Sequence, residues 1–240
     1  MKIIKPRVFI TEFDPTEIMR SLEAKARLCY RSFDNISSDS ADRLVRNLIK
    51  RGHEAMIEHE SLHIQFVCDR GVTHEIVRHR LGAYAQESTR YCNYASDKLG
   101  GELTVIEPFF FSNEPQYYNL WYCACAAAES AYLELLSQGA TPQEARSVLP
   151  NSTKTAIWCT YNLRELRHFL KLRTEKGAHP QMRQIAIPLL SALRKRLPAV
   201  FSDIDVDVDT ISEPLLGNFA EVRIVSRDFT MLGDKEDEQR

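Results

Sequence analysis

Three arginines lie close together in the sequence, around a histidine and a serine. Arg78 and Arg80 flank His79, and after seven intervening residues come Ser88 and then Arg90. A guanidinium group is planar and binds phosphate through paired hydrogen bonds. The types and spacing of these residues therefore indicate a site for a phosphorylated, nucleotide-like ligand.

The alternative is a solvated surface on which these arginines form ion pairs with Glu75 and Glu87. The residues between the arginines favour ligand binding, because Gly82, Ala83 and Ala85 let a ligand approach the backbone closely. The sequence contains neither G-x-G-x-x-G nor G-K-[ST], the glycine-rich loops of Rossmann and P-loop proteins. A nucleotide would have to be held in another way.

A second group of polar residues includes His53, Glu58, His59 and His63. Histidines and carboxylates can bind a divalent metal ion, which would make the chain a metal-dependent nucleotide-phosphate hydrolase. The spacing does not match H-E-x-x-H, because residue 57 is isoleucine. This spacing therefore predicts no metal site, and these side chains could equally contact a polar cofactor or cap the turn at Gly52.

A third group lies far along the chain and consists of Asn162, Arg164, His168 and Arg173, with Arg146 upstream. A helix is predicted to start at Asn162, so its N-terminal dipole and the Arg164 guanidinium could face an anion. The alternatives are an exposed ion pair of Arg164 with a neighbouring glutamate and a purely structural His168. This third group indicates a ligand site only if the fold places it next to Arg78, Arg80 and Arg90.

Composition limits the class of protein. The chain has 240 residues, 44% of them hydrophobic and 27% charged, with a net charge of −2. These values are typical of a soluble globular protein and argue against a general nucleic-acid or membrane-surface binder. No apolar run approaches the roughly 20 residues that span a bilayer, and the six scattered cysteines suit reduced thiols. We expect a cytoplasmic protein with no nucleic-acid or membrane partner.

The hydrophobic pattern predicts one α+β domain in which helices pack on a small mixed or antiparallel sheet. The domain is expected to cover residues 1–200, with a C-terminal extension at 201–240 that ends in a frayed acidic tail. One long helix is predicted at Asn113–Gln138. The residues expected near its buried face are Tyr118, Trp121, Tyr122, Cys125, Tyr132 and Leu136. The predicted elements are a short strand at Val8–Ile10, helices starting at Asp14 and Ser40, a strand at Leu62–Cys68, a helix capped by Thr73 that carries Arg78 to Arg80, a mostly irregular stretch at 81–101, a helix at Asn113–Gln138, a short helix in a capping box at Thr141, a strand at Thr153–Tyr161, a helix in a capping box at Asn162–Glu165 and a helix at Pro180–Arg196.

These residues together resemble a known family. Arg78-His79-Arg80, seven residues, Ser88 and then Arg90-Tyr91 is similar to the signature of the flavin-dependent thymidylate synthases. The resemblance covers about residues 24–190, most of the chain. The other matching segments are Gly52-His53-Glu54 with Glu58-His59, Arg146, Leu149-Pro150, Asn162-x-Arg164 and Phe169-Leu170-x-Leu172-Arg173.

The resemblance implies a methyltransferase that converts dUMP to dTMP. Methylenetetrahydrofolate would supply the carbon, and FAD reduced by NADPH would supply the hydride. It also implies a homotetramer whose active sites are shared between subunits. Assembly of that kind would explain why the basic residues come from three separate segments of the chain.

The resemblance also assigns roles to individual residues. Arg173 would be catalytic, facing the uracil ring and stabilising the negative charge that develops there. Ser88 would orient dUMP, since the family chemistry needs no covalent enzyme nucleophile. The residues expected to bind dUMP are Glu75, Ile76, Val77, Arg78, Gln86, Glu87, Ser88, Thr89, Arg90, Arg146 and Arg173. Those expected to bind FAD are His53, Ala55, Glu58, Arg78, His79, Arg80, Gln86, Asn162, Leu163, Arg164 and His168.

Three departures from the family pattern stand out. Ala85-Gln86 stands where the family often has Asn-Glu, so one contact with the flavin or the nucleotide is expected to be altered. Glu87 is expected to take over part of the role of the missing glutamate. Ala55 stands where serine or threonine is common and removes a hydroxyl near the flavin, and Met56-Ile57 replaces a Pro-Phe pair. None of these changes removes an arginine, so we expect the phosphate contacts to be kept.

Overall fold

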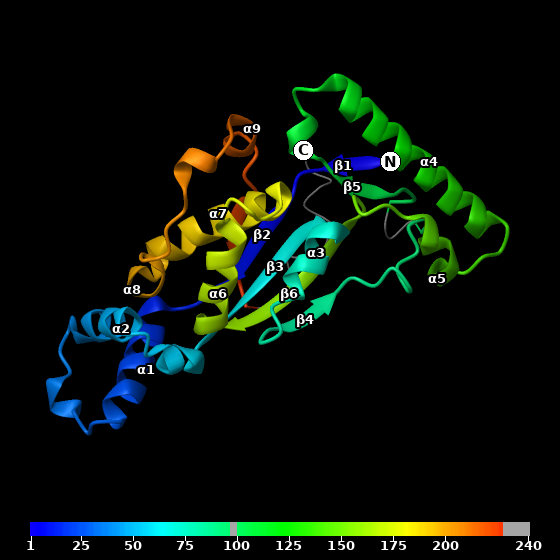
Figure 1. Cartoon of the computed structure of the whole chain (residues 1–240). Coiled ribbons are helices and arrows are strands. Elements are labelled where there is room, and N and C mark those ends of the chain that lie inside the picture. Colours follow the sequence, from blue (N-terminus) through cyan, green and yellow to red (C-terminus); the bar gives the residue numbers. More distant parts are fainter. Residues whose placement is uncertain (97–99, 228–240) are drawn as a thin grey trace.

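The computed structural model describes residues 1–96 and 100–227 of the chain. It contains both helices and strands, and the helices lie around a sheet, as Figure 1 shows. The strands are β1 (Lys2–Ile4), β2 (Arg7–Thr11), β3 (Ser61–Asp69), β4 (Ala83–Gln86), β5 (Thr104–Ile106), β6 (Lys154–Asn162) and β7 (Glu221–Val225). The α-helices are α1 (Pro15–Leu28), α2 (Ser40–Lys50), α3 (Arg70–Ile76), α4 (Pro115–Ser137), α5 (Pro142–Ala145), α6 (Leu163–Thr174), α7 (Pro180–Arg196), α8 (Pro198–Phe201) and α9 (Glu213–Leu216).

The main sheet has five strands in the order β4-β6-β3-β2-β7. Its pairs are antiparallel except for β2 and β7, which run parallel. Strand β6 alternates between buried and half-buried residues along its length, so one of its faces packs on the core. β1 and β5 form a separate parallel pair. The predicted α+β class with a small mixed sheet is confirmed.

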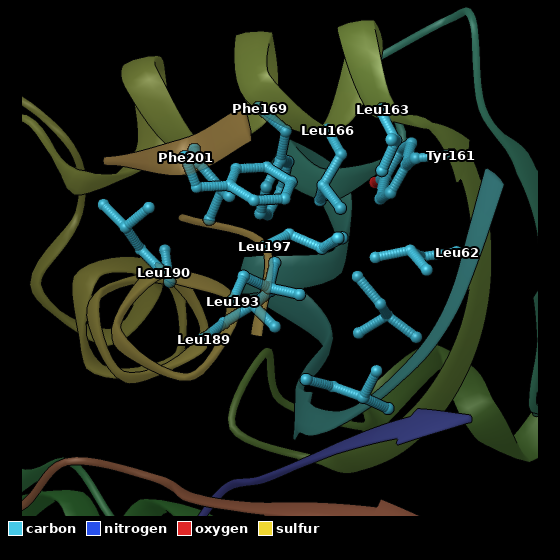
Figure 2. Packing of buried hydrophobic residues seen from close by; sticks show 14 of the residues in the cluster. Leu62, Tyr161, Leu163, Leu166, Phe169, Leu189, Leu190, Leu193, Leu197 and Phe201 are labelled. Atoms are coloured by element: carbon cyan, nitrogen blue, oxygen red, sulfur yellow. The ribbon is translucent and has the colours of Figure 1, made fainter. Parts of the chain in front are cut away.

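The core lies between the sheet and the helices α6 and α7 (Figure 2). Leu62 and Tyr161 of the sheet face Leu166 and Phe169 of α6 and Leu193 of α7, and none of these side chains is more than 2% exposed. Fully burying a leucine or phenylalanine side chain stabilises the fold by about 1.5–3 kcal/mol. The buried stripe fixes the rotation of α6, and therefore the direction of its polar face.

Helix α3 differs from the prediction in its start and end. Asp69 caps it, because the Asp69 carboxylate accepts a hydrogen bond of 2.8 Å from the backbone N–H of Val72. The predicted cap at Thr73 is wrong, since Asp69 provides a cap one turn earlier. The helix ends at Ile76, so Arg78 to Arg80 follow it in a turn and do not lie on it.

Helix α4 is far more exposed than predicted. Of the six residues expected near its buried face, only Cys125 and Tyr132 are buried. Tyr122 is 44% exposed, and Leu120 on the same helix is 70% exposed. The helix covers a small cluster beside β1 and β5, at the opposite end of the molecule from α1 and α2 (Figure 1).

The chain beyond residue 200 contributes to the main body. Phe201 and Ile204 belong to the core, and β7 adds a strand to the sheet. The predicted boundary at residue 200 falls within α8 and stays a prediction. The predicted tail from Asp234 to Arg240 lies outside the described residues. Along 1–96 and 100–227, no helix has the length and apolar character needed to cross a membrane.

Candidate active site

The turn that holds the arginine-histidine-arginine segment is tightly packed. The Tyr84 hydroxyl lies within hydrogen-bond distance of the carbonyl oxygens of Ile76, at 3.2 Å, and of His79. Gly82 fits because it has no side chain: a Cβ atom there would lie 2.6 Å from Cε1 of Tyr161. Strands β4 and β6 thus hold the turn against the sheet edge, and the small residue noted in the sequence has a steric reason.

His79 is the buried centre of this turn and contacts Arg173. The Nε of Arg173 donates a hydrogen bond of 3.0 Å to Nε2 of His79. The same guanidinium donates to Glu75 twice, to the carboxylate at 2.7 Å and to the backbone carbonyl at 3.1 Å. Burial, and then the positive charges of Arg173 and His168, lower the pKa of His79 to about 4. The imidazole is therefore neutral at neutral pH.

A cleft of about 730 Å³ opens next to His79. One face of α6 supplies Arg164, His168 and Lys171, which follow one another at intervals of four and three residues and are all exposed. A negatively charged, phosphate-bearing cofactor fits such a set of basic side chains. The residues that line the cleft are Glu54, Arg78, His79, Arg80, Leu81, Arg164, Glu165, His168 and Lys171.

The structure brings five of the predicted FAD residues to this cleft, namely Arg78, His79, Arg80, Arg164 and His168. Glu58 also reaches its edge, through an ion pair with Arg164. The sequence did not point to Glu54, Leu81, Glu165 and Lys171 as lining residues. The four-and-three spacing along α6 was a signal for Lys171, whereas the two glutamates depend on the packing of segments far apart in the chain.

The other predicted FAD residues are not in the cleft lining. His53 and Ala55 are exposed near the short 3-10 helix at Glu54–His59. Asn162 caps α6 by accepting a hydrogen bond from the backbone of Glu165, and Leu163 is fully buried. The remaining predicted FAD residue is Gln86, whose side chain is hydrogen-bonded to other residues of the chain.

The side-chain amide of Gln86 donates to the hydroxyls of Thr73, at 3.0 Å, and Thr155, at 3.3 Å. This residue stands where the family often has glutamate, and its amide ties the end of β4 to α3 and β6. In a single chain Gln86 therefore has an internal structural contact that the sequence did not reveal.

A second cluster surrounds the end of β4. Arg146 donates a hydrogen bond of 3.3 Å to the hydroxyl of Thr89, although the two residues are 57 positions apart. Glu87 forms an ion pair of 3.2 Å with Lys154. Arg90 is exposed, and its guanidinium lies 5.3 Å from the ring centre of Tyr91. This cluster unites predicted dUMP residues from two of the separate segments.

The predicted dUMP residues thus form two clusters within one chain. Arg78 lines the cleft, and Arg173 with Glu75 adjoins it through the hydrogen bond from Arg173 to His79. The stretch from Glu87 to Arg90 lies with Arg146. Of the other three, Ile76 is buried in the core, Val77 is exposed after α3, and Gln86 is held by Thr73 and Thr155.

The residues of the metal hypothesis are not arranged as ligands. Within 1–96 and 100–227, no three histidine, cysteine or acidic side chains form a group that could hold a metal ion. Glu58 pairs with Arg164, and His63 lies beside the hydroxyl of Thr160 at 2.9 Å. This geometry gives the hydrolase alternative based on His53, Glu58 and His59 no support.

The architecture, a mixed sheet covered by helices, is shared with a solved nucleotide methylase. The chain resembles the UMP/dUMP methylase PolB from Streptomyces cacaoi, in structures bound with 5-Br dUMP and 5-Br UMP, with TM-scores of 0.70 and 0.67. The match covers 84% of this chain and 96% or 95% of PolB, at 22% sequence identity. At that identity the likeness establishes the shared fold.

Sequence comparisons define the family. The family described as Thymidylate synthase complementing protein matches residues 14–199. The chain is 34% identical over 166 residues to the flavin-dependent thymidylate synthase of Pyrococcus furiosus, which covers 69% of this chain and 67% of that protein. It is 32% identical over 205 residues to the enzyme of the same name from Corynebacterium diphtheriae, covering 78% and 79%. The chain belongs to the family of flavin-dependent thymidylate synthases, so the resemblance seen in the sequence is confirmed.

Proposed function

We propose that this chain catalyses the reductive methylation of dUMP to dTMP. Membership of a flavin-dependent family implies FAD as cofactor, with NADPH and methylenetetrahydrofolate as co-substrates. The single observation that carries the proposal is the placement of the Arg173 guanidinium, which Glu75 and His79 hold beside a cleft lined with cations. FAD, when bound and reduced by NADPH, supplies the hydride.

The cleft suits the diphosphate of FAD. Arg78, Arg80 and Arg164 are exposed there, and His168 lies on the same face of α6 as Arg164. Guanidinium groups bind phosphate oxygens in a paired geometry, so these arginines would hold the diphosphate. Lys171 adds a further cation at the same wall.

The second cluster suits the phosphate of dUMP. The guanidinium groups of Arg90 and Arg146 are exposed and flank the turn at Ser88. The Ser88 hydroxyl accepts a hydrogen bond of 3.3 Å from the backbone N–H of Arg90, which stabilises a turn whose backbone can face an anion. Ser88 would therefore orient the nucleotide and would not attack it.

Arg173 is proposed to act on the uracil ring. A guanidinium has five N–H donors, and three of those of Arg173 are used by Glu75 and His79. Two donors remain to bind the oxygen and nitrogen atoms of the pyrimidine. A fixed positive charge there stabilises the negative charge that develops as the ring is activated, without reorganisation during the reaction.

The two clusters favour a site shared between copies of the chain, as in the predicted homotetramer. Helix α4 offers a surface for such contact, because Leu120, Ala124, Ala127 and Ala131 are all exposed and follow a four-three-four spacing. This spacing is the pattern of a helix that packs along another helix. An exposed apolar stripe on one helix commonly marks an interaction surface.

The proposal is tested by the visible absorption spectrum of the purified protein after incubation with FAD. Stoichiometric flavin, bleached by NADPH and perturbed by dUMP, is the expected result. A protein that takes up no flavin but hydrolyses nucleotide phosphates in the presence of a divalent metal would support the alternative. A cytoplasmic location, and the absence of nucleic-acid or membrane partners, stay predictions.

A further inference from the structure

Glu165 occupies a helix position where a glutamate normally caps the helix, but its carboxylate is directed elsewhere. Its backbone N–H donates to Asn162 as expected for the third residue of α6. In α5 the equivalent Glu144 turns back, and its carboxylate accepts from the backbone of Thr141 at 2.8 Å. The carboxylate of Glu165 is instead buried against His79. The carboxylate of Glu165 therefore contacts the imidazole of His79, which in turn accepts a hydrogen bond from Arg173.

The geometry around His79 defines its tautomer. Arg173 can only donate, so the Nε2 of His79 that receives its hydrogen bond must carry a lone pair. In a neutral imidazole the proton then sits on Nδ1. The carboxylate oxygen Oε1 of Glu165 lies 3.4 Å from that nitrogen, and the two side chains are only 3% and 6% exposed. Among the described residues, Nδ1 has no hydrogen bond of standard geometry, so Glu165 is placed to be its acceptor.

We propose that Glu165 is a positioning residue that orients Arg173 through His79. The Glu165 carboxylate accepts the Nδ1 proton, which leaves Nε2 free to accept from the Nε of Arg173. In the opposite tautomer an N–H would face the Arg173 N–H, and the two donors would repel each other. The arrangement transfers no proton and breaks no bond; it fixes which way the imidazole presents its lone pair.

The surroundings of His79 are consistent with a neutral ring held in one orientation. His168 lies at 5.4 Å between ring centres, and the edge of Phe169 packs on the imidazole at 4.9 Å. Burial raises the pKa of Glu165, whereas His168 opposes that rise. The N-terminal dipole of α6 further favours a carboxylate at the third helical position.

The test compares two substitutions of Glu165 in the FAD-loaded enzyme. Glu165→Leu removes the acceptor at similar volume, and we expect kcat for dTMP formation to fall about 10-fold or more because the guanidinium is misplaced. Glu165→Gln keeps an oxygen acceptor and should recover most of the wild-type kcat. In both variants FAD affinity and the KM for dUMP should change by a smaller factor than kcat does in Glu165→Leu. Glu23→Leu is the matched control, because Glu23 is an equally buried carboxylate that pairs with Arg27 in α1; it should lower stability and leave kcat unchanged.

A second readout does not depend on turnover. In histidine-labelled protein, ¹⁵N NMR distinguishes a protonated Nδ1 from a protonated Nε2, and His79→Gln identifies the signal of His79. We expect a protonated Nδ1 in the wild type and a mixture of tautomers in Glu165→Leu. An unchanged tautomer together with unchanged kcat in Glu165→Leu would overturn the proposal. The role of Arg173 towards uracil rests on the proposed function, so a wild-type enzyme that forms no dTMP would refute that function. The NMR signal of His79 would still show whether Glu165 fixes the tautomer of His79.

Discussion

Arg173 and His79 share a 3.0 Å hydrogen bond although they are 94 positions apart in the sequence. The bond joins the last turn of α6 to the turn that follows α3. Because Glu75 binds the same guanidinium from α3 itself, the side chain is held from two sides. For the catalytic role proposed for Arg173, a side chain fixed in this way needs little rearrangement when substrate arrives, which is a condition for effective electrostatic catalysis.

Arg173→Lys should reduce turnover severely without weakening FAD binding. Lysine keeps the positive charge but cannot donate to Glu75 and His79 and to the uracil ring in the same planar geometry. We expect kcat to fall on the order of 10²-fold or more. Steady-state kinetics and a fluorescence titration with FAD would measure the two effects separately. Wild-type turnover in Arg173→Lys would remove the assigned role.

The neutral state of His79 predicts a specific dependence of stability on pH. Its pKa is lowered from the ordinary value of 6.5 to about 4 in the folded protein. Between these values the unfolded chain binds the proton more readily, so protonation favours unfolding. The contribution of neutral His79 to the free energy of unfolding is therefore complete above pH 6.5 and is lost as the pH falls towards about 4.

Urea unfolding at a series of pH values would detect this contribution. The wild type should lose stability between pH 6.5 and 4, and His79→Gln should lose less over the same interval. His53→Gln, a change at an exposed histidine, is the matched control and should keep the wild-type slope. Identical slopes in all three proteins would show that His79 is not held neutral by the fold.

Gly82→Ala should destabilise the turn that carries the arginines. The added methyl group would lie 2.6 Å from the Tyr161 ring and 2.8 Å from the Tyr84 hydroxyl, so the turn must shift. Overpacking of this kind costs about 1–3 kcal/mol of unfolding free energy. Gly177→Ala is the control, because a Cβ there meets no atom within 4 Å. If both variants unfold at the same urea concentration as the wild type, the close packing of Gly82 is not a constraint.

Leu120→Arg should disrupt the proposed assembly. Leu120 is 70% exposed on α4, and a charge in an apolar contact between helices would leave a cation without a partner. Light scattering coupled to gel filtration should find wild-type particles that are multiples of the 27.6 kDa chain and smaller particles for the variant. Leu216→Arg changes an exposed leucine on α9 and should leave the mass unchanged. A monomeric wild type would contradict a shared site.

Local patterns predicted the elements whose signals lie within a few residues. The start of α1 is an example, since Asp14 accepts a hydrogen bond of 2.8 Å from the backbone of Thr16 as its Asp-Pro sequence indicated. The prediction started α3 too late because Thr73 is also a suitable cap residue, whereas Asp69 both ends β3 and caps the helix. The exposure of α4 could not be predicted, because its apolar residues indicate burial without saying whether another chain provides it.

The candidate site was predictable in composition but not in arrangement. The motif identified Arg78, His79 and Arg80, and the family resemblance assigned Arg164 and His168 to the cofactor; all five line the cleft. The direction of the Glu165 side chain was not predictable, because capping and contact with His79 are both compatible with its position in the sequence. Only the packing of α6 against the turn after α3 distinguishes them.

The most direct test of the proposed activity is a single turnover in the absence of oxygen. FAD-loaded protein is reduced by NADPH, freed of excess NADPH, and mixed with dUMP and methylenetetrahydrofolate, and the nucleotide product is identified by mass spectrometry. The proposed activity predicts dTMP in an amount equal to the bound FAD, and none when methylenetetrahydrofolate is omitted. Recovery of unchanged dUMP from protein that binds both FAD and dUMP would contradict it.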